Sequence, residues 1–236
     1  MRTNRRVIRQ VACRRIARTA AVTAVLLGLA GAAAPVAAQT VVAGSVRVAI
    51  RPGVAPSPVV VYAQPLEKPV PAGPASFTLS QKNKAFTPSV LGVPAGSTIA
   101  FPNEDAIFHN VFSLSAPMPF DLGLYRSGES KSRVFRDVAT YRVFCNIHPQ
   151  MSAVIVVAPT PYITVTDRQG AFSLTVPPGR YRITATTGRG APVTREVTID
   201  GTSANLDPID VDESGLVEAP HTNKFGKPYP KEAYRR

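Results

Sequence analysis

Residues 141–157, YRVFCNIHPQMSAVIVV, are the most informative stretch of the chain. The apolar, β-branched runs 141–144 and 152–157 predict two strands joined by a tight loop. Three side chains on so short a loop can converge on one point at the end of a sheet. They are a thiol, an imidazole and a thioether in the spacing Cys-x2-His-x2-Met: Cys145, His148 and Met151.

A second imidazole comes from a distant part of the chain. Residues 101–105 end one predicted strand and residues 108–111 begin the next, which places His109 at a strand end. Two imidazoles, a thiolate and a weak axial thioether form the ligand set of a blue-copper electron-transfer site. Asn110 is predicted to hydrogen-bond across the two ligand segments and tie them together. Met118 is an alternative axial ligand, although it lies outside the short loop.

Cysteine usage favours a metal site. The chain has two cysteines, Cys13 and Cys145, and Cys13 lies in the N-terminal segment described below. Cys145 would therefore have no internal disulfide partner, so it is reactive, paired between molecules, or occupied by a ligand. Zinc also uses cysteine and histidine, but it does not use a thioether. A Cys-x-x-Cys-His haem motif is absent, and no oxyanion donors support a Cys–His nucleophile.

The N-terminal 38 residues have the order of a secretory signal. Residues 2–18 carry seven arginines and no acid, residues 20–34 are apolar, and Val36-Ala37-Ala38 precedes Gln39 as a small-residue cleavage pattern. We predict a periplasmic or secreted protein without a stable membrane insertion. A retained anchor and a twin-arginine export route are the alternatives.

Export also changes the meaning of the net charge. The chain carries +12, but removal of the seven signal arginines leaves 20 Lys+Arg against 15 Asp+Glu, or +5. The remaining basic residues are scattered instead of forming a stripe with aromatic residues. The composition therefore argues against a nucleic-acid partner.

The remainder of the chain is predicted to be all-β. The 23 prolines and the short β-branched runs argue against long helices. We predict a first β domain at residues 39–158, a second at 159–212 and a polar, extended or poorly ordered tail at 213–236. The predicted strands are 45–50, 59–62, 89–93, 97–101, 110–113, 132–134, 141–145, 152–157, 162–166, 171–176, 181–186 and 193–199.

The first domain resembles the cupredoxins. The matching residues are 86–88, 93–96, 101–103, His109-Asn110 and 144–151, and the short final loop is similar to that of amicyanin. The arrangement with a following β module resembles bacterial plastocyanin-like proteins often labelled methylamine-utilisation proteins. The resemblance implies a Greek-key β-sandwich with one copper ion on His109, Cys145, His148 and Met151.

The second domain resembles the carboxypeptidase regulatory-like, or transthyretin-like, β-sandwich. Residues 166–174 and 176–181 carry that resemblance, including the turn Asp167-Arg168-Gln169-Gly170. It implies a structural or adhesive module and no peptidase activity.

These features predict a non-enzymatic protein that transfers single electrons between periplasmic partners, such as a c-type cytochrome or a quinoprotein dehydrogenase. The edge of the His148 ring is the expected electron exit, surrounded by an apolar collar of Ile147, Pro149, Met118 and Pro119. Two alternatives are a copper carrier without a redox partner and a structural module with a vestigial site. The sequence leaves the oligomeric state open.

Several other polar residues are candidates for a second site. His221 in the tail is predicted to be solvated, with a tail metal site as the alternative. Glu104, Asp105 and Asp121 are predicted to be solvated loop charges, with a second metal as the alternative.

Overall fold

The computed structural model describes residues 39–71, 73–217 and 221–230, and within these ranges every regular element is a β-strand. The prediction of an all-β fold is therefore confirmed for the part of the chain described. None of the described residues belongs to a helix with the length and apolarity needed to cross a bilayer. The predicted signal lies outside the described residues and stays a prediction.

The first sandwich places the ligand-bearing strands at the centre of a sheet. Strands β11 (Thr140–Phe144) and β12 (Ser152–Ala158) are antiparallel neighbours, as residues 141–157 predict, and β8 (His109–Ser113) lies on the other side of β11. One sheet has the order β6 (Val90–Pro94), β12 (Ser152–Ala158), β11 (Thr140–Phe144), β8 (His109–Ser113) and β9 (Phe120–Tyr125). Facing it are β10 (Ser130–Phe135), β7 (Ser97–Pro102) and β3 (Ser76–Thr78), with a small ladder of β4 (Ser80–Lys82) and β5 (Ala85–Thr87).

An aromatic core holds these two sheets together. The rings of Phe101, Phe120, Phe135 and Tyr141 are buried and contact one another at centroid distances of 5.2–6.5 Å. Each buries a large apolar area, so this cluster is a main source of stability for the sandwich. Cys145 and Met151 belong to the same core cluster, which anchors the ligand loop to the rigid interior.

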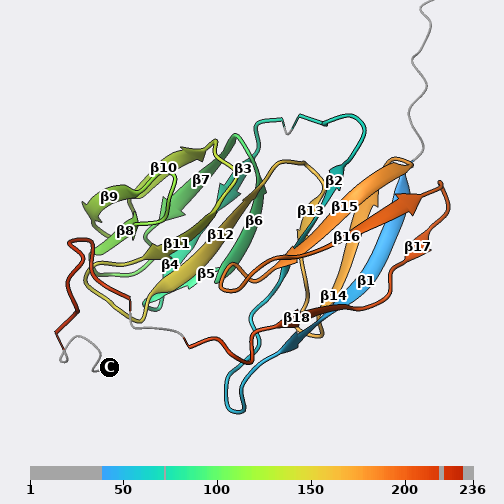
Figure 1. Cartoon of the computed structure of the whole chain (residues 1–236). Coiled ribbons are helices and arrows are strands. Elements are labelled where there is room, and N and C mark those ends of the chain that lie inside the picture. The colour runs from blue at the N-terminus through green and yellow to red at the C-terminus, as the bar shows by residue number, and fades with distance from the viewer. Residues whose placement is uncertain (1–38, 72, 218–220, 231–236) are drawn as a thin grey trace, which may run out of the picture. The chain divides into compact units, whose positions relative to one another are not determined.

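The second sandwich combines strands from both ends of the described chain (Figure 1). Strand β1, drawn in blue, pairs with β14, drawn in orange, so that Thr40 lies opposite Val176. One sheet contains β14 (Ala171–Val176), β1 (Thr40–Ala49), β17 (Ala204–Asn205) and β18 (Ile209–Asp212). The other contains β13 (Ile163–Val165), β2 (Val60–Pro65), β15 (Gly179–Thr186) and β16 (Val193–Ile199).

This pairing differs from the division predicted at residue 158. The sequence predicts residues 39–158 as one domain with an N-terminal strand extension. Instead β1 and β2 pair with strands that follow residue 158, and Val42 and Val61 lie in the second core. The physical reason is burial, since Val42 and Val46 on β1 and Val61 on β2 are buried in the core of the second sandwich. Strands β3 to β12 are thus an insertion between β2 and β13.

The predicted turn 167–170 is present, and its last residue requires glycine. Gly170 has a φ of +83° and its amide donates to the Asp167 carbonyl. A Cβ added at Gly170 would lie 2.2 Å from the Val46 carbonyl oxygen, which is main chain of the central strand β1.

We therefore expect Gly170→Ala to lower the melting temperature more than Gly53→Ala. Gly53 has a φ of +82° and no heavy atom within 4 Å of its added Cβ. Gly53→Ala therefore incurs only the left-handed backbone strain of about 1–2 kcal/mol, whereas Gly170→Ala adds a clash with main chain. Equal melting temperatures for the two variants would contradict the close approach of the turn to β1.

Candidate metal centre

The ligand loop is closed by its own backbone. The Cys145 amide donates to the Met151 carbonyl at 3.2 Å, and the Met151 amide donates to the His148 carbonyl at 2.9 Å. Strand β11 ends at Phe144 and β12 begins at Ser152, so the loop joins two paired strands. His109 is the first residue of β8, which pairs with β11 through Phe112 and Phe144. The sheet therefore brings two segments that are distant in sequence to the same end.

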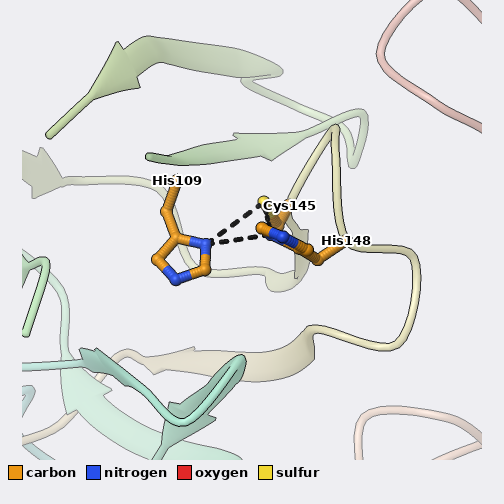
Figure 2. Close-up of side chains that lie close together, drawn as sticks. All are labelled: His109, Cys145 and His148. Carbon is orange, nitrogen blue, oxygen red and sulfur yellow. Dashed lines mark hydrogen bonds between the residues drawn. The ribbon is translucent and has the colours of Figure 1, made fainter. Parts of the chain in front are cut away.

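Three predicted ligands meet at this end, as Figure 2 shows. The Nδ1 atoms of His109 and His148 are 3.1 Å apart, and the Cys145 Sγ lies 3.9 Å from the first and 3.7 Å from the second. Metal bonds of about 2.0–2.1 Å to nitrogen and 2.3 Å to sulfur span up to about 4.1–4.4 Å between two donors. One ion can therefore be bonded to all three atoms.

Burial separates the two methionines that the sequence offers as a fourth ligand. Met151 is fully buried in the same core cluster as Cys145, whereas Met118 is 38% exposed. Met151 therefore has the surroundings of an internal axial ligand, and Met118 has those of a surface residue.

The protonation of the centre also suits a metal. Burial raises the pKa of the Cys145 thiol, although the amides of Ile147, Asn110 and His148 act in the opposite direction. Burial, followed by the neighbouring His109, lowers the pKa of His148 and favours its neutral form. A neutral imidazole can donate its lone pair, and a bound cation would replace the thiol proton.

Asp105 orients the buried imidazole of His109. Its Oδ2 lies 2.7 Å from His109 Nε2, and its carboxylate also accepts from the amides of Asn83 and Lys84 at 2.6 and 2.8 Å. Burial acts to raise the pKa of Asp105, but these hydrogen bonds together lower it below its usual value. An ionised carboxylate only accepts, so Nε2 carries the proton and Nδ1 presents its lone pair to the cluster.

Our interpretation of Asp105 as a solvated loop charge was therefore wrong. Its sequence position, four residues before His109, was the available signal, but the loop geometry decides whether the carboxylate reaches the ring. Glu104 does match the predicted surface charge, being exposed and 3.4 Å from Lys82. Among residues 39–71, 73–217 and 221–230, the one cluster of metal-binding side chains found is His109, Cys145 and His148.

The predicted role of Asn110 is confirmed. Its Oδ1 accepts from the Asn146 amide at 3.3 Å, and its Nδ2 donates to Asp121 at 2.7 Å. Strand β8 is thereby joined to the Cys145 loop. Asp121, predicted to be a solvated charge, is engaged in this network.

Comparisons with known proteins give structural likenesses only. No protein-family model matches the chain, and no curated protein sequence matches it. A purple cupredoxin from Nitrosopumilus maritimus is similar over 34% of this chain and 98% of its own, with 20% identity and a TM-score of 0.32. A reduced amicyanin variant is similar over 34% of this chain and 80% of its own, with 23% identity and a TM-score of 0.33.

A copper-containing nitrite reductase from Thermus scotoductus SA-01 also shows similarity. It covers 40% of this chain and 25% of its own length, with 28% identity and a TM-score of 0.33. The solved structures that resemble the chain thus include cupredoxins and one enzyme. The resemblance of the second sandwich to carboxypeptidase regulatory-like domains stays a prediction.

Proposed function

We propose that this protein binds one copper ion through His109, Cys145 and His148, with Met151 as a weak axial ligand, and transfers single electrons. The observation that carries the proposal is the meeting of two Nδ1 atoms and one Sγ within 3.9 Å of one another. Copper bound there would supply one-electron chemistry between Cu(I) and Cu(II). The donor set fits copper better than zinc, because the fourth predicted ligand, Met151, is a thioether.

The chain's own contribution is to hold these donors still. Cys145 and His109 are fully buried, and the ligand loop is closed by backbone hydrogen bonds. Asn110 fixes the two ligand segments to each other. A rigid set of mixed soft and nitrogen donors suits both oxidation states, so little rearrangement accompanies electron transfer.

His148 is the proposed electron exit. It is partly exposed, unlike His109 and Cys145. Exposed apolar side chains flank both histidines in sequence: Ile107 (39%), Phe108 (57%) and Ile147 (41%). We propose that they form the docking surface for an exported redox partner such as a c-type cytochrome or quinoprotein dehydrogenase.

Pro149 is buried, so its predicted place in an exposed collar was wrong.

The test is the visible and EPR spectrum of the copper-loaded chain, followed by stopped-flow mixing with a reduced c-type cytochrome. We expect an intense thiolate-to-copper band that bleaches on reduction and returns on oxidation. A colourless Cu(II) protein would contradict the copper assignment. A coloured protein that exchanges no electrons but passes copper to an apoprotein would contradict electron transfer.

We expect Asp105→Asn to weaken copper binding by about 10–100-fold, the usual cost of losing an outer hydrogen-bond partner of a metal ligand. The neutral amide removes the charge that orients His109. Competition with a chromophoric chelator measures the change. Glu104→Gln is the matched control, since it neutralises the adjacent but exposed carboxylate. Equal affinities for the two variants would contradict the role of Asp105.

A further inference from the structure

The C-terminal segment 221–230 contacts three consecutive residues at the end of β11 and the start of the ligand loop: Phe144, Cys145 and Asn146. His221 stacks on Phe144, with ring centroids 4.1 Å apart and an interplanar angle of 12°. The Tyr229 hydroxyl donates to the Cys145 carbonyl at 2.9 Å, and the Lys224 amide donates to Asn146 Oδ1 at 3.0 Å. The prediction of a solvated His221 in an extended or poorly ordered tail therefore does not describe this segment.

Tyr229 is the most deeply placed of these residues. It is 7% exposed, and its ring packs edge-on against His221 at 5.2 Å between centroids. Its hydroxyl binds the carbonyl of the ligand residue itself. Burying a tyrosine ring contributes apolar area, while its hydroxyl donates to a main-chain carbonyl.

Lys224 closes a ring of hydrogen bonds around the ligand segments. Its Nζ lies 2.6 Å from Asp121 Oδ2, and Asp121 Oδ1 accepts from Asn110 Nδ2. Asn110 Oδ1 accepts from the Asn146 amide, and Asn146 Oδ1 accepts from the Lys224 amide. The circuit therefore joins β8, β9, the Cys145 loop and the C-terminal segment.

We propose that residues 221–230, hereafter the strap, are part of the metal centre, with Tyr229 and His221 as positioning residues for the Cys145 main chain. This rests on the proposed function. Neither residue is a metal ligand. The strap contacts residues 144–146, whereas Asn110 of β8 accepts a hydrogen bond from the Asn146 amide. A strap that is loosened lets the thiolate loop move, which speeds metal loss and changes the thiolate–metal bond.

The first test compares Tyr229→Phe with Tyr181→Phe in the full chain. Both substitutions delete a hydroxyl that donates to a main-chain carbonyl, but Tyr181 binds Pro177 in the second sandwich. We expect copper release to a chelator to become about 5–10-fold faster in Tyr229→Phe, the effect of one net hydrogen bond, and unchanged in Tyr181→Phe. The thiolate-to-copper band and the midpoint potential should shift only in Tyr229→Phe.

The second test uses His221, where stacking can be lost and restored. His221→Ala removes the ring against Phe144, and His221→Phe keeps a flat ring in its place. We expect faster copper release and a shifted band in His221→Ala, and recovery of both in His221→Phe. A His221→Phe variant as impaired as His221→Ala would overturn stacking as the way His221 acts.

A measurement on the metal-free chain separates this inference from the copper assignment. Hydrogen exchange in the peptide covering residues 141–151 should be about 5–10-fold faster in Tyr229→Phe than in Tyr181→Phe. Unchanged exchange and unchanged copper release would overturn the strap while leaving the copper site intact. If the unaltered chain binds no copper but the two variants still differ in exchange, the copper function would be overturned, and the strap would remain a clamp on the loop.

Discussion

We expect the replacement of Cys145 with serine to abolish the visible charge-transfer absorption proposed for the copper-loaded protein. The band requires a thiolate-to-copper bond, and the Cys145 Sγ lies 3.9 and 3.7 Å from the Nδ1 atoms of His109 and His148. Copper affinity should fall by more than the roughly 10–100-fold that accompanies loss of an outer hydrogen-bond partner, because a metal-bonding atom itself is replaced. Absorption spectroscopy and chelator competition measure the two effects.

The methionines provide the control for this prediction. Met118→Leu removes a soft sulfur that is 38% exposed and should leave the spectrum unchanged. Met151→Leu keeps the buried volume but removes the axial thioether, and it should shift the band without abolishing it. Colour that survives in Cys145→Ser, or that disappears in Met118→Leu, would rule out the assigned ligands. A circular-dichroism melt shows whether each variant is folded.

Val42→Asp should unfold the second sandwich. Val42 is 1% exposed on β1, which lies between β14 and β17 and packs in the second core. An unpaired carboxylate there costs several kcal/mol, a large share of a typical domain stability of about 5–15 kcal/mol. Limited proteolysis should then cut within residues 159–217, far from the substitution in sequence.

Val41→Asp is the matched control, because Val41 is the adjacent residue on β1 and is 45% exposed. Its melting temperature and protease resistance should stay close to those of the unaltered chain. If Val42→Asp instead exposed residues 66–158 to protease and spared the second sandwich, the pairing of β1 with β14 would be wrong.

The sequence was sufficient to predict those features of the fold and the site that depend on residues close together in the chain. Cys145, His148 and Met151 lie within seven residues, so a turn between two strands is enough to bring them together. Regular alternation also identified β14 and β16 with their observed bounds. His109 could also be predicted from the sequence as a ligand, because a distinctive donor set limits which histidine can complete it.

What could not be predicted depends on contacts between distant residues. The bond from Asp105 to His109 is set by the path of a loop, and the amides of Asn83 and Lys84 hold that carboxylate in place. Likewise, a polar, turn-rich composition does not reveal that Tyr229 reaches Cys145, since the strap obtains its order from the surface it covers. Strands β1 and β2 pair with strands of the second sandwich that lie far along the chain. The local alternation of apolar and polar residues does not determine such a long-range pairing.

The insertion of β3 to β12 between β2 and β13 imposes an order on the maturation of the chain. Thr40 leaves the ribosome 136 residues before its partner Val176, an interval on the order of ten seconds at about 5–20 residues per second. During that interval β1 and β2 have their apolar faces uncovered, and the strands that carry all the proposed ligands are completed before it ends. The strap follows β18 in the sequence, so the loop around Cys145 is secured only after the strands of both sandwiches have been made.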